Sequence, residues 1–213
     1  MLKSLLLRAC ERLALNGLAV GDYAKAERWL RRIQAIEGDS RRVLHNLALA
    51  RLAQGDFVGA EALLSRLADR HGETPEVLRA RAEAAYLSGD RDNARARLAA
   101  ALADPDCRER SLLARRATLC EDADAYARAI AGKRDFAEGN AKLAAGDKDA
   151  ALAAFRRAAA ADPTDFVARN NLGTLLMNHV GDRAAAAAVF EEALALADQP
   201  ILRRNLAAAR DTG

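Results

Sequence analysis

Apolar residues along this chain recur at i, i+3, i+4 and i+7 spacing, which is typical of amphipathic helices. The stretch from residue 48 to residue 67 shows the pattern most regularly, because a Gly-Asp pair at 55–56 precedes an apolar stripe at Ala60, Leu63, Leu64 and Leu67. Glycine permits a tight turn, and an Asp near a helix start can cap it. The pattern predicts that one helix ends and another begins here, forming a helical hairpin.

The hairpin pattern repeats at a nearly constant interval. Gly-Asp pairs begin at residues 21, 55, 89, 146 and 181, so the intervals are 34, 34, 57 and 35 residues. A small residue precedes each of the first four turns by seven positions and the last by eight, at Ala14, Ala48, Ala82, Gly139 and Gly173. Small residues let neighbouring helices approach closely. The chain is therefore predicted to be a series of helical hairpins.

The periodicity predicts paired helices over 3–19 and 22–37, 40–54 and 56–71, 75–88 and 90–103, 134–145 and 147–161, and 165–179 and 182–197. Segment 199–210 repeats the first half of a hairpin and is predicted to be a lone capping helix. Between 107 and 131 the Gly-Asp turn is missing, and two short helices are expected, one over 111–120 and one starting at 121. This gives three N-terminal repeats in 1–106, an irregular shortened hairpin in 107–131, two repeats in 132–198, and a cap and tail in 199–213.

Two charged residues interrupt the apolar pattern beside the irregular hairpin. Arg81 and Glu138 stand directly before the small residue of their repeats, where Leu13, Leu47, Leu172 and Leu206 stand in the other units. A buried charge needs a partner. Either the two residues pair across the irregular hairpin, or the local register differs.

Composition supports an all-α protein, because the chain is 51% hydrophobic but only 4% aromatic and is rich in Ala, Leu, Arg and Glu. The net charge is +3 with the two signs interspersed, which argues against nucleic-acid binding. Three cysteines without a CxxC pair argue against a disulfide framework and favour a reducing cytoplasm. No apolar run is long enough for a membrane span, and residues 5–7 are too short for the core of a signal peptide.

The sequence offers no recognisable catalytic or metal-binding motif. The three histidines lie in different repeats and form no HExxH spacing, and there is no GxSxG, P-loop or GxGxxG sequence. We therefore expect no enzymatic activity, no cofactor and no metal.

The 34-residue interval, the small residue, the Gly-Asp turn and the closing Asp-Pro resemble the tetratricopeptide repeat. The closest unit runs from Phe136 to Pro163 and carries Gly139, Ala151, Phe155, Ala158 and Asp162. The resemblance implies a right-handed superhelical α-solenoid of antiparallel helix pairs whose first helices line a concave groove. Family groove positions give these candidates: Arg42, His45, Asn46, Arg79, Tyr86, Asn140, Asn170 and Asn171.

The resemblance implies a scaffold that binds a peptide or helix of a partner protein in that groove. The family's carboxylate clamp for chaperone tails is disfavoured, because Phe136 and Ile201 stand where cations are required. A second hypothesis is a cytoplasmic chaperone or assembly factor for a secretion or pilus system, which would keep an otherwise aggregating client soluble. The oligomeric state is left open.

Overall fold

The repeated Gly-Asp pairs have the same local structure at every turn of the computed structural model, which describes residues 2–211. Each glycine has a φ between 78° and 88°, the left-handed region that favours glycine. Each following Asp is the N-cap of the next helix, where its carboxylate accepts the N–H of the residue three positions later. The motif therefore ends one helix and starts the next.

The described residues form α-helices with one π-helical turn and no strand. Contacts divide them into two compact units, Met1–Arg108 and Glu109–Gly213. Unit 1 contains α1 (Leu2–Val20), α2 (Tyr23–Glu37), α3 (Arg41–Ala53), α4 (Phe57–His71), α5 (Pro75–Ser88) and α6 (Arg91–Ala103). Unit 2 contains α7 (Arg110–Glu121), α8 (Ala123–Ala144), α9 (Lys148–Ala161), α10 (Phe166–Leu175), η1 (Leu176–Val180), α11 (Arg183–Leu196) and α12 (Pro200–Arg210). Apart from α8, and with η1 counted as the end of α10, the helices predicted for the repeats lie within one residue of these bounds.

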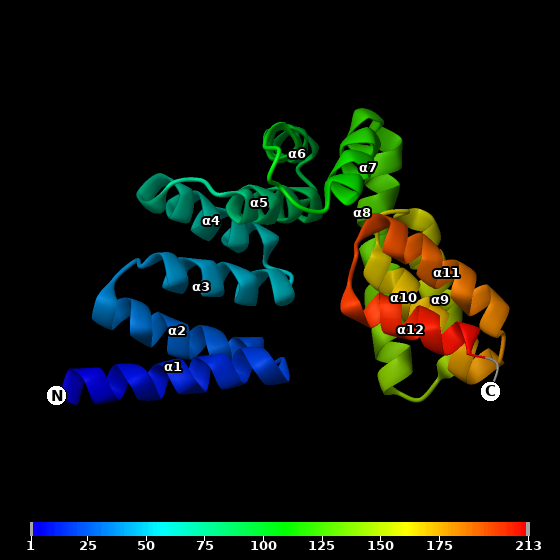
Figure 1. The fold of residues 1–213 in the computed structure, drawn as a ribbon, viewed down its shortest axis with the longest axis horizontal. Helices are drawn as coiled ribbons and strands as arrows, with labels where there is room; N and C mark the ends of the chain where they lie inside the picture. The colour runs from blue at the N-terminus through cyan, green and yellow to red at the C-terminus, as the bar shows by residue number, and fades with distance from the viewer. Residues whose placement is uncertain (1, 212–213) are drawn as a thin grey trace. The chain divides into compact units, whose positions relative to one another are not determined.

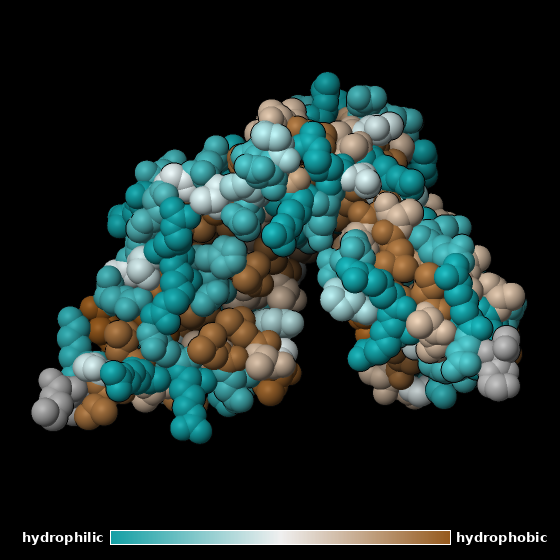
Figure 2. Space-filling view, viewed as in Figure 1, coloured by the Kyte–Doolittle hydropathy of each residue, from teal (hydrophilic) through white to brown (hydrophobic). Residues whose placement is uncertain are grey.

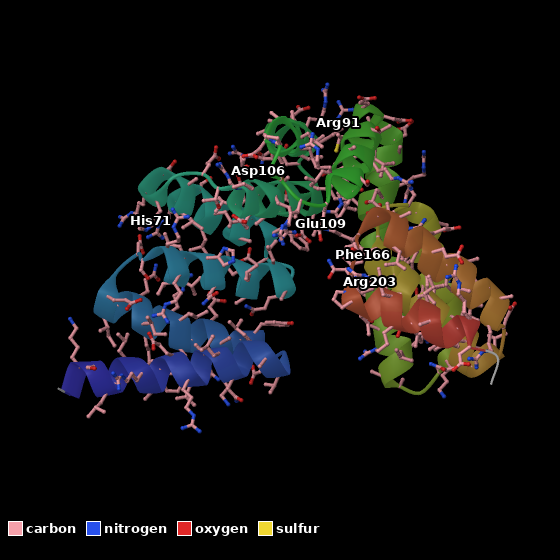
Figure 3. The ribbon with its side chains drawn as sticks, in the orientation of Figure 1. His71, Arg91, Asp106, Glu109, Phe166 and Arg203 are labelled. Atoms are coloured by element: carbon pink, nitrogen blue, oxygen red, sulfur yellow. The ribbon has the colours of Figure 1, made fainter. Side chains whose placement is uncertain are left out.

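Unit 1 is a stack of antiparallel helix pairs, α1–α2, α3–α4 and α5–α6 (Figure 1). Its core combines alanines with leucines from successive pairs, including Leu30, Leu44 and Leu64. The end of α4 is tied to the turn before α3, because His71 Nε2 lies 2.8 Å from the carbonyl oxygen of Asp39 (Figure 3). Stacked pairs of this kind confirm the prediction of an all-α solenoid. The prediction that residues 1–213 form one continuous array stays a prediction.

Unit 2 pairs α8 with α9 and α10 with α11 around two phenylalanines. A Cβ atom added at Gly139 would lie 2.6 Å from the Phe155 ring, and one at Gly173 would lie 2.7 Å from the Phe190 ring. The glycines therefore make room for aromatic rings at the helix crossings. Helix α7 joins this unit through Leu112, which clusters with Leu196, Ala197 and Phe166; Phe166 is labelled in Figure 3.

The structure around residue 131 differs from the prediction, because α8 runs through it. Two helices were predicted there, one starting at 121 and one over 134–145, but residues 123–144 form a single helix. Gly132 lies within this helix and does not end it. Its missing side chain lets α8 pack closely against α9, since an added Cβ would lie 2.7 Å from the Cβ of Ala161. The irregular hairpin and the following repeat therefore share one helix.

The longer last interval, 35 residues instead of 34, is absorbed by a π-helical turn. Residues 176–180 form η1 at the end of α10, between Gly173 and Gly181. A π turn takes one more residue than an α turn. The extra position is thus accommodated without displacing Gly173 from Phe190.

Arg81 and Glu138 have different surroundings, and they do not pair with each other. The Arg81 side chain is buried and bonds Glu61, Glu73 and the Ser65 hydroxyl, all within unit 1. Glu138 is exposed and pairs with Arg157 at 2.7 Å. The expectation that they bridge the irregular hairpin is wrong.

Helix α12 covers the apolar side of α11. Leu202 and Ala209 are buried, and Leu202 belongs to the core cluster of unit 2. Its other face carries Arg203 and Arg210, which pair with Asp198 and Glu191. The predicted capping helix is present, with its charged side turned to solvent.

Candidate protein-interaction surface

The best-defined candidate residues lie on the face of unit 1 to which α1, α3 and α5 contribute. Arg42, in the first turn of α3, is exposed and hydrogen-bonds Glu11 of α1. It also lies 3.5 Å from Glu37, the last residue of α2. The bond to Glu11 raises the pKa of the Arg42 guanidinium, so the side chain stays charged. Arg42 is thus a solvent-accessible cation whose position is fixed by Glu11 and Glu37.

The same surface includes His45 of α3 and Arg79 of α5. Burial of the imidazole and the nearby charge of Arg79 lower the pKa of His45, while Glu76 acts in the opposite direction. His45 is therefore neutral at pH 7. Arg79 is half-buried and pairs with Glu83 one turn later at 3.3 Å. The face combines a neutral imidazole with compensated charges.

Arg42, His45 and Asn46 meet at an open depression of about 400 Å³. The remaining lining residues are Arg41, Leu67, Thr74, Glu76 and Val77. Leu67 and Val77 are buried core residues, whereas Arg42 and Glu76 are exposed. The depression therefore has an apolar base and a charged rim, which suits one apolar side chain of a polar peptide.

Tyr86 is not accessible on this surface. The side chain is fully buried, at 0% exposure, so the hypothesis that it lines a groove is wrong for this residue. Two leucines at an inward-pointing family position of the first two repeats are exposed, Leu15 at 56% and Leu49 at 37%. They are 34 positions apart and therefore equivalent in successive repeats.

The asparagine candidates of unit 2 lie on two helices. Asn140 is exposed on α8, and Asn170 and Asn171 are half-buried on α10. The Asn170 side-chain oxygen accepts a hydrogen bond from Asn205 Nδ2 at 2.8 Å, which links α10 to α12. Asn170 therefore already has a structural role, whereas Asn140 is open to solvent.

Within residues 2–211, no group of three or more His, Cys, Asp and Glu side chains could hold a metal ion. All three cysteines are buried. No helix in the described part of the chain is long and apolar enough to cross a membrane.

The fold and this surface define a helical-hairpin repeat protein, a class whose stacked repeats form extended binding surfaces. Residues 17–84 match the family model described as tetratricopeptide repeat. Outside that segment, the hairpins of unit 2 have the same turn, cap and small-residue crossing.

Solved structures with a similar fold include other repeat proteins. "Crystal structure of MamA protein" is 17% identical, with 89% of this chain and 90% of that chain covered and a TM-score of 0.43. TTC0263, a thermophilic TPR protein in Thermus thermophilus, is 22% identical, with coverages of 95% and 98% and a TM-score of 0.43. The TPR2AB domain of yeast Sti1 is 14% identical, with coverages of 97% and 84% and a TM-score of 0.46. A comparison with curated protein sequences gives no match.

Proposed function

We propose that this chain is a protein-interaction scaffold that binds an extended or helical segment of a partner protein on the α1–α3–α5 face of unit 1. One observation carries the proposal: Arg42, His45 and Asn46 converge on one open depression with an apolar base. The repeat itself requires the small residues, the stripe and the Gly-Asp turn, but it does not require these three side chains. Side chains that packing leaves undetermined are the ones that can specify a partner.

The contacts of the depression indicate the chemistry of the bound segment. Arg42 is held by Glu11 and Glu37, and Arg79 by Glu83, so neither cation is an isolated charge. Exposed Leu15 and Leu49 add apolar contact area on the first and second repeats. A segment with one apolar anchor and flanking polar groups of both signs fits this face better than a uniformly acidic one.

Affinity purification of the native chain, followed by mass spectrometry, tests the proposal. The Arg42→Glu/Arg79→Glu variant should lose the recovered partner and keep its helical circular dichroism, because both side chains are partly exposed. Arg95→Glu/Arg115→Glu is the matched control, with the same charge change on α6 and α7. Equal recovery with both variants would move the site off this face.

The same purification addresses the alternative of a cytoplasmic chaperone or assembly factor. A scaffold partner stays soluble without the chain, whereas a chaperone client precipitates when it is produced alone. Sedimentation of the recovered partner, with and without the chain, decides between the two. Turnover of a small molecule by the purified chain, with no protein recovered, would contradict both.

A further inference from the structure

Helix α1 exposes an apolar stripe on the side that faces away from its own hairpin. Leu5, Leu6 and Val20 are 59%, 52% and 66% exposed, and Ala9 lies between them on the same side of the helix. The buried side of α1 carries Cys10, Ala14 and Gly17, which pack towards α2. In Figure 2, apolar side chains lie among hydrophilic ones over this end of unit 1.

In the next repeats, one position of this stripe is covered by a helix. Ala9 and its half-buried neighbour Leu13 correspond, 34 positions on, to Val43 and Leu47 of α3, which are 1% and 0% exposed, whereas Leu5, Leu6 and Val20 correspond to the polar residues Asp39, Ser40 and Gln54. Val43 lines a small cavity together with Leu30 and Ile33 of α2, so the second helix of the preceding pair covers it. The α5 equivalent, Val77, is 2% exposed. Helix α1 therefore leaves exposed, at Ala9, a position that is a buried stacking contact in the next two repeats.

Charged residues occupy the positions equivalent to Ala9 and Leu13 in the first full hairpin of unit 2. With Gly139 aligned to Ala14, Ala9 and Leu13 correspond to Arg134 and Glu138 of α8, and both are exposed. Helix α8 thus presents charged residues at the positions where α1 presents alanine and leucine.

The surroundings of the α1 stripe are basic. Arg8 and Arg12 of α1 are both exposed along one flank of the stripe. The carboxylates of α1 and α2 have partners elsewhere: Glu11 and Glu37 pair with Arg42, and Glu27 pairs with Arg51. Among the described residues of α1 and α2, no carboxylate pairs with Arg8 or Arg12, so this flank is positively charged.

We propose that the outer face of α1 docks an amphipathic helix of a partner protein, with an apolar stripe against Leu6 and Val20 and acidic residues beside Arg8 and Arg12. The helix takes the place against α1 that α2 takes against α3. This surface is separate from the depression around His45, so it extends the proposed function.

A peptide derived from α2 is a suitable probe, since α2 covers Val43, the equivalent of Ala9 on α3. The peptide has the sequence of residues 23–37 with Lys25, Arg28, Arg31 and Arg32 replaced by Glu, and an N-terminal fluorophore. Anisotropy titration with the full chain should show saturable binding of this acidic peptide. The unmodified basic peptide should bind at least about tenfold more weakly, because its charge opposes the flank.

Two variants of the chain locate the peptide. Leu6→Glu/Val20→Glu should weaken binding of the acidic peptide at least about tenfold, because it places charge in an apolar contact. Arg8→Glu/Arg12→Glu should weaken it without touching the stripe. Val58→Glu, at a position 72% exposed on α4, is the control and should bind normally. Arg42→Glu/Arg79→Glu should also bind normally, which separates this face from the proposed groove.

Three results would overturn the proposal. The first is the absence of acidic-peptide binding, or equal loss with Val58→Glu. The second is a dimer in sedimentation analysis that Leu6→Glu/Val20→Glu converts to a monomer, which would make a second copy the occupant. The third is Leu6-dependent binding to phosphatidylserine vesicles in preference to the peptide, which would make the face a membrane contact.

Discussion

The two units make the same helix crossing with different pairs of side chains. In unit 1 the equivalent positions are occupied by an alanine and a leucine, as at Ala48 and Leu64, which are fully buried in the same core cluster. In unit 2 a glycine faces a phenylalanine, as at Gly139 and Phe155. The smaller residue on one helix compensates for the larger one on the other. The repeat therefore keeps the volume at the crossing nearly constant while the residues vary.

The units differ more at the position directly before the small residue. Arg81 of unit 1 is 7% exposed and bonded to two glutamates, whereas Glu138 of unit 2 is exposed. Identical repeat positions thus have opposite burial. A neighbouring helix decides the burial, since α4 supplies Glu61 and Ser65 around Arg81.

Among the substitutions considered, we expect the largest loss in the free energy of unfolding at Arg81. Arg81→Ala removes the buried cation between Glu61 and Glu73 and should lower the free energy of unfolding by about 2–3 kcal/mol, below the usual cost of breaking a buried pair because Arg97 still bonds Glu61. Glu138→Ala should cost less than about 0.5 kcal/mol, as exposed pairs do. Urea denaturation of both variants measures the difference, and equal losses would contradict the assigned burial.

The glycine–phenylalanine crossing is expected to be the next most sensitive. Gly139→Ala improves helix propensity by about 1 kcal/mol but pushes a methyl group into the Phe155 ring, so we expect a net loss of about 1–2 kcal/mol. Adding Phe155→Leu should recover part of that loss, since the pair then resembles Ala48 and Leu64. A double-mutant cycle by urea denaturation measures the coupling. Additive losses would show that the two side chains do not compensate for each other.

The next effect depends on pH and concerns Lys133, which lies near Arg116, Asp162 and Asp165 in unit 2. Burial lowers the pKa of Lys133 to about 8, from 10.5 for a free lysine. The folded chain then releases this proton at lower pH than the unfolded chain, so stability rises between about pH 8 and pH 10.5. Thermal melts should show this rise in the native chain relative to Lys133→Met. Parallel pH profiles for the two proteins would exclude it.

The smallest effect is expected at the π turn. Deleting Asn178 restores a 34-residue interval between the last two Gly-Asp pairs and should convert η1 to α-helix. The pair between His179 and Asp149, now 2.8 Å apart, should be lost, but the exposed site limits the cost to about 1 kcal/mol or less. Cooperative melting within a few degrees of the native chain is the expected result. Loss of cooperativity would show that the extra residue is required.

Most of the fold could be predicted from the sequence because the structure of each Gly-Asp turn is determined by residues that are close together in the chain. A left-handed glycine and a capping Asp act within four residues, so periodicity locates them without tertiary information. The course of α8 could not be predicted in this way, since Gly132 serves close packing against Ala161 and does not end the helix.

The candidate site was only partly predictable for the same reason. Arg42, His45 and Asn46 could be placed by repeat position, and they do line one depression. The burial of Tyr86 and Arg81 depends on residues that are distant in sequence, which helical spacing does not report. Whether any of these side chains contacts a partner stays a prediction.

Hydrogen exchange of the full chain, with and without the co-purified partner, tests most directly the claim that binding uses residues that the repeat does not require. With the partner bound, we expect slower exchange in α3 and α5 around residues 42–46 and 76–79, with little change in α4 and α6. Protection confined to unit 2, or unchanged exchange in α3 and α5, would contradict it.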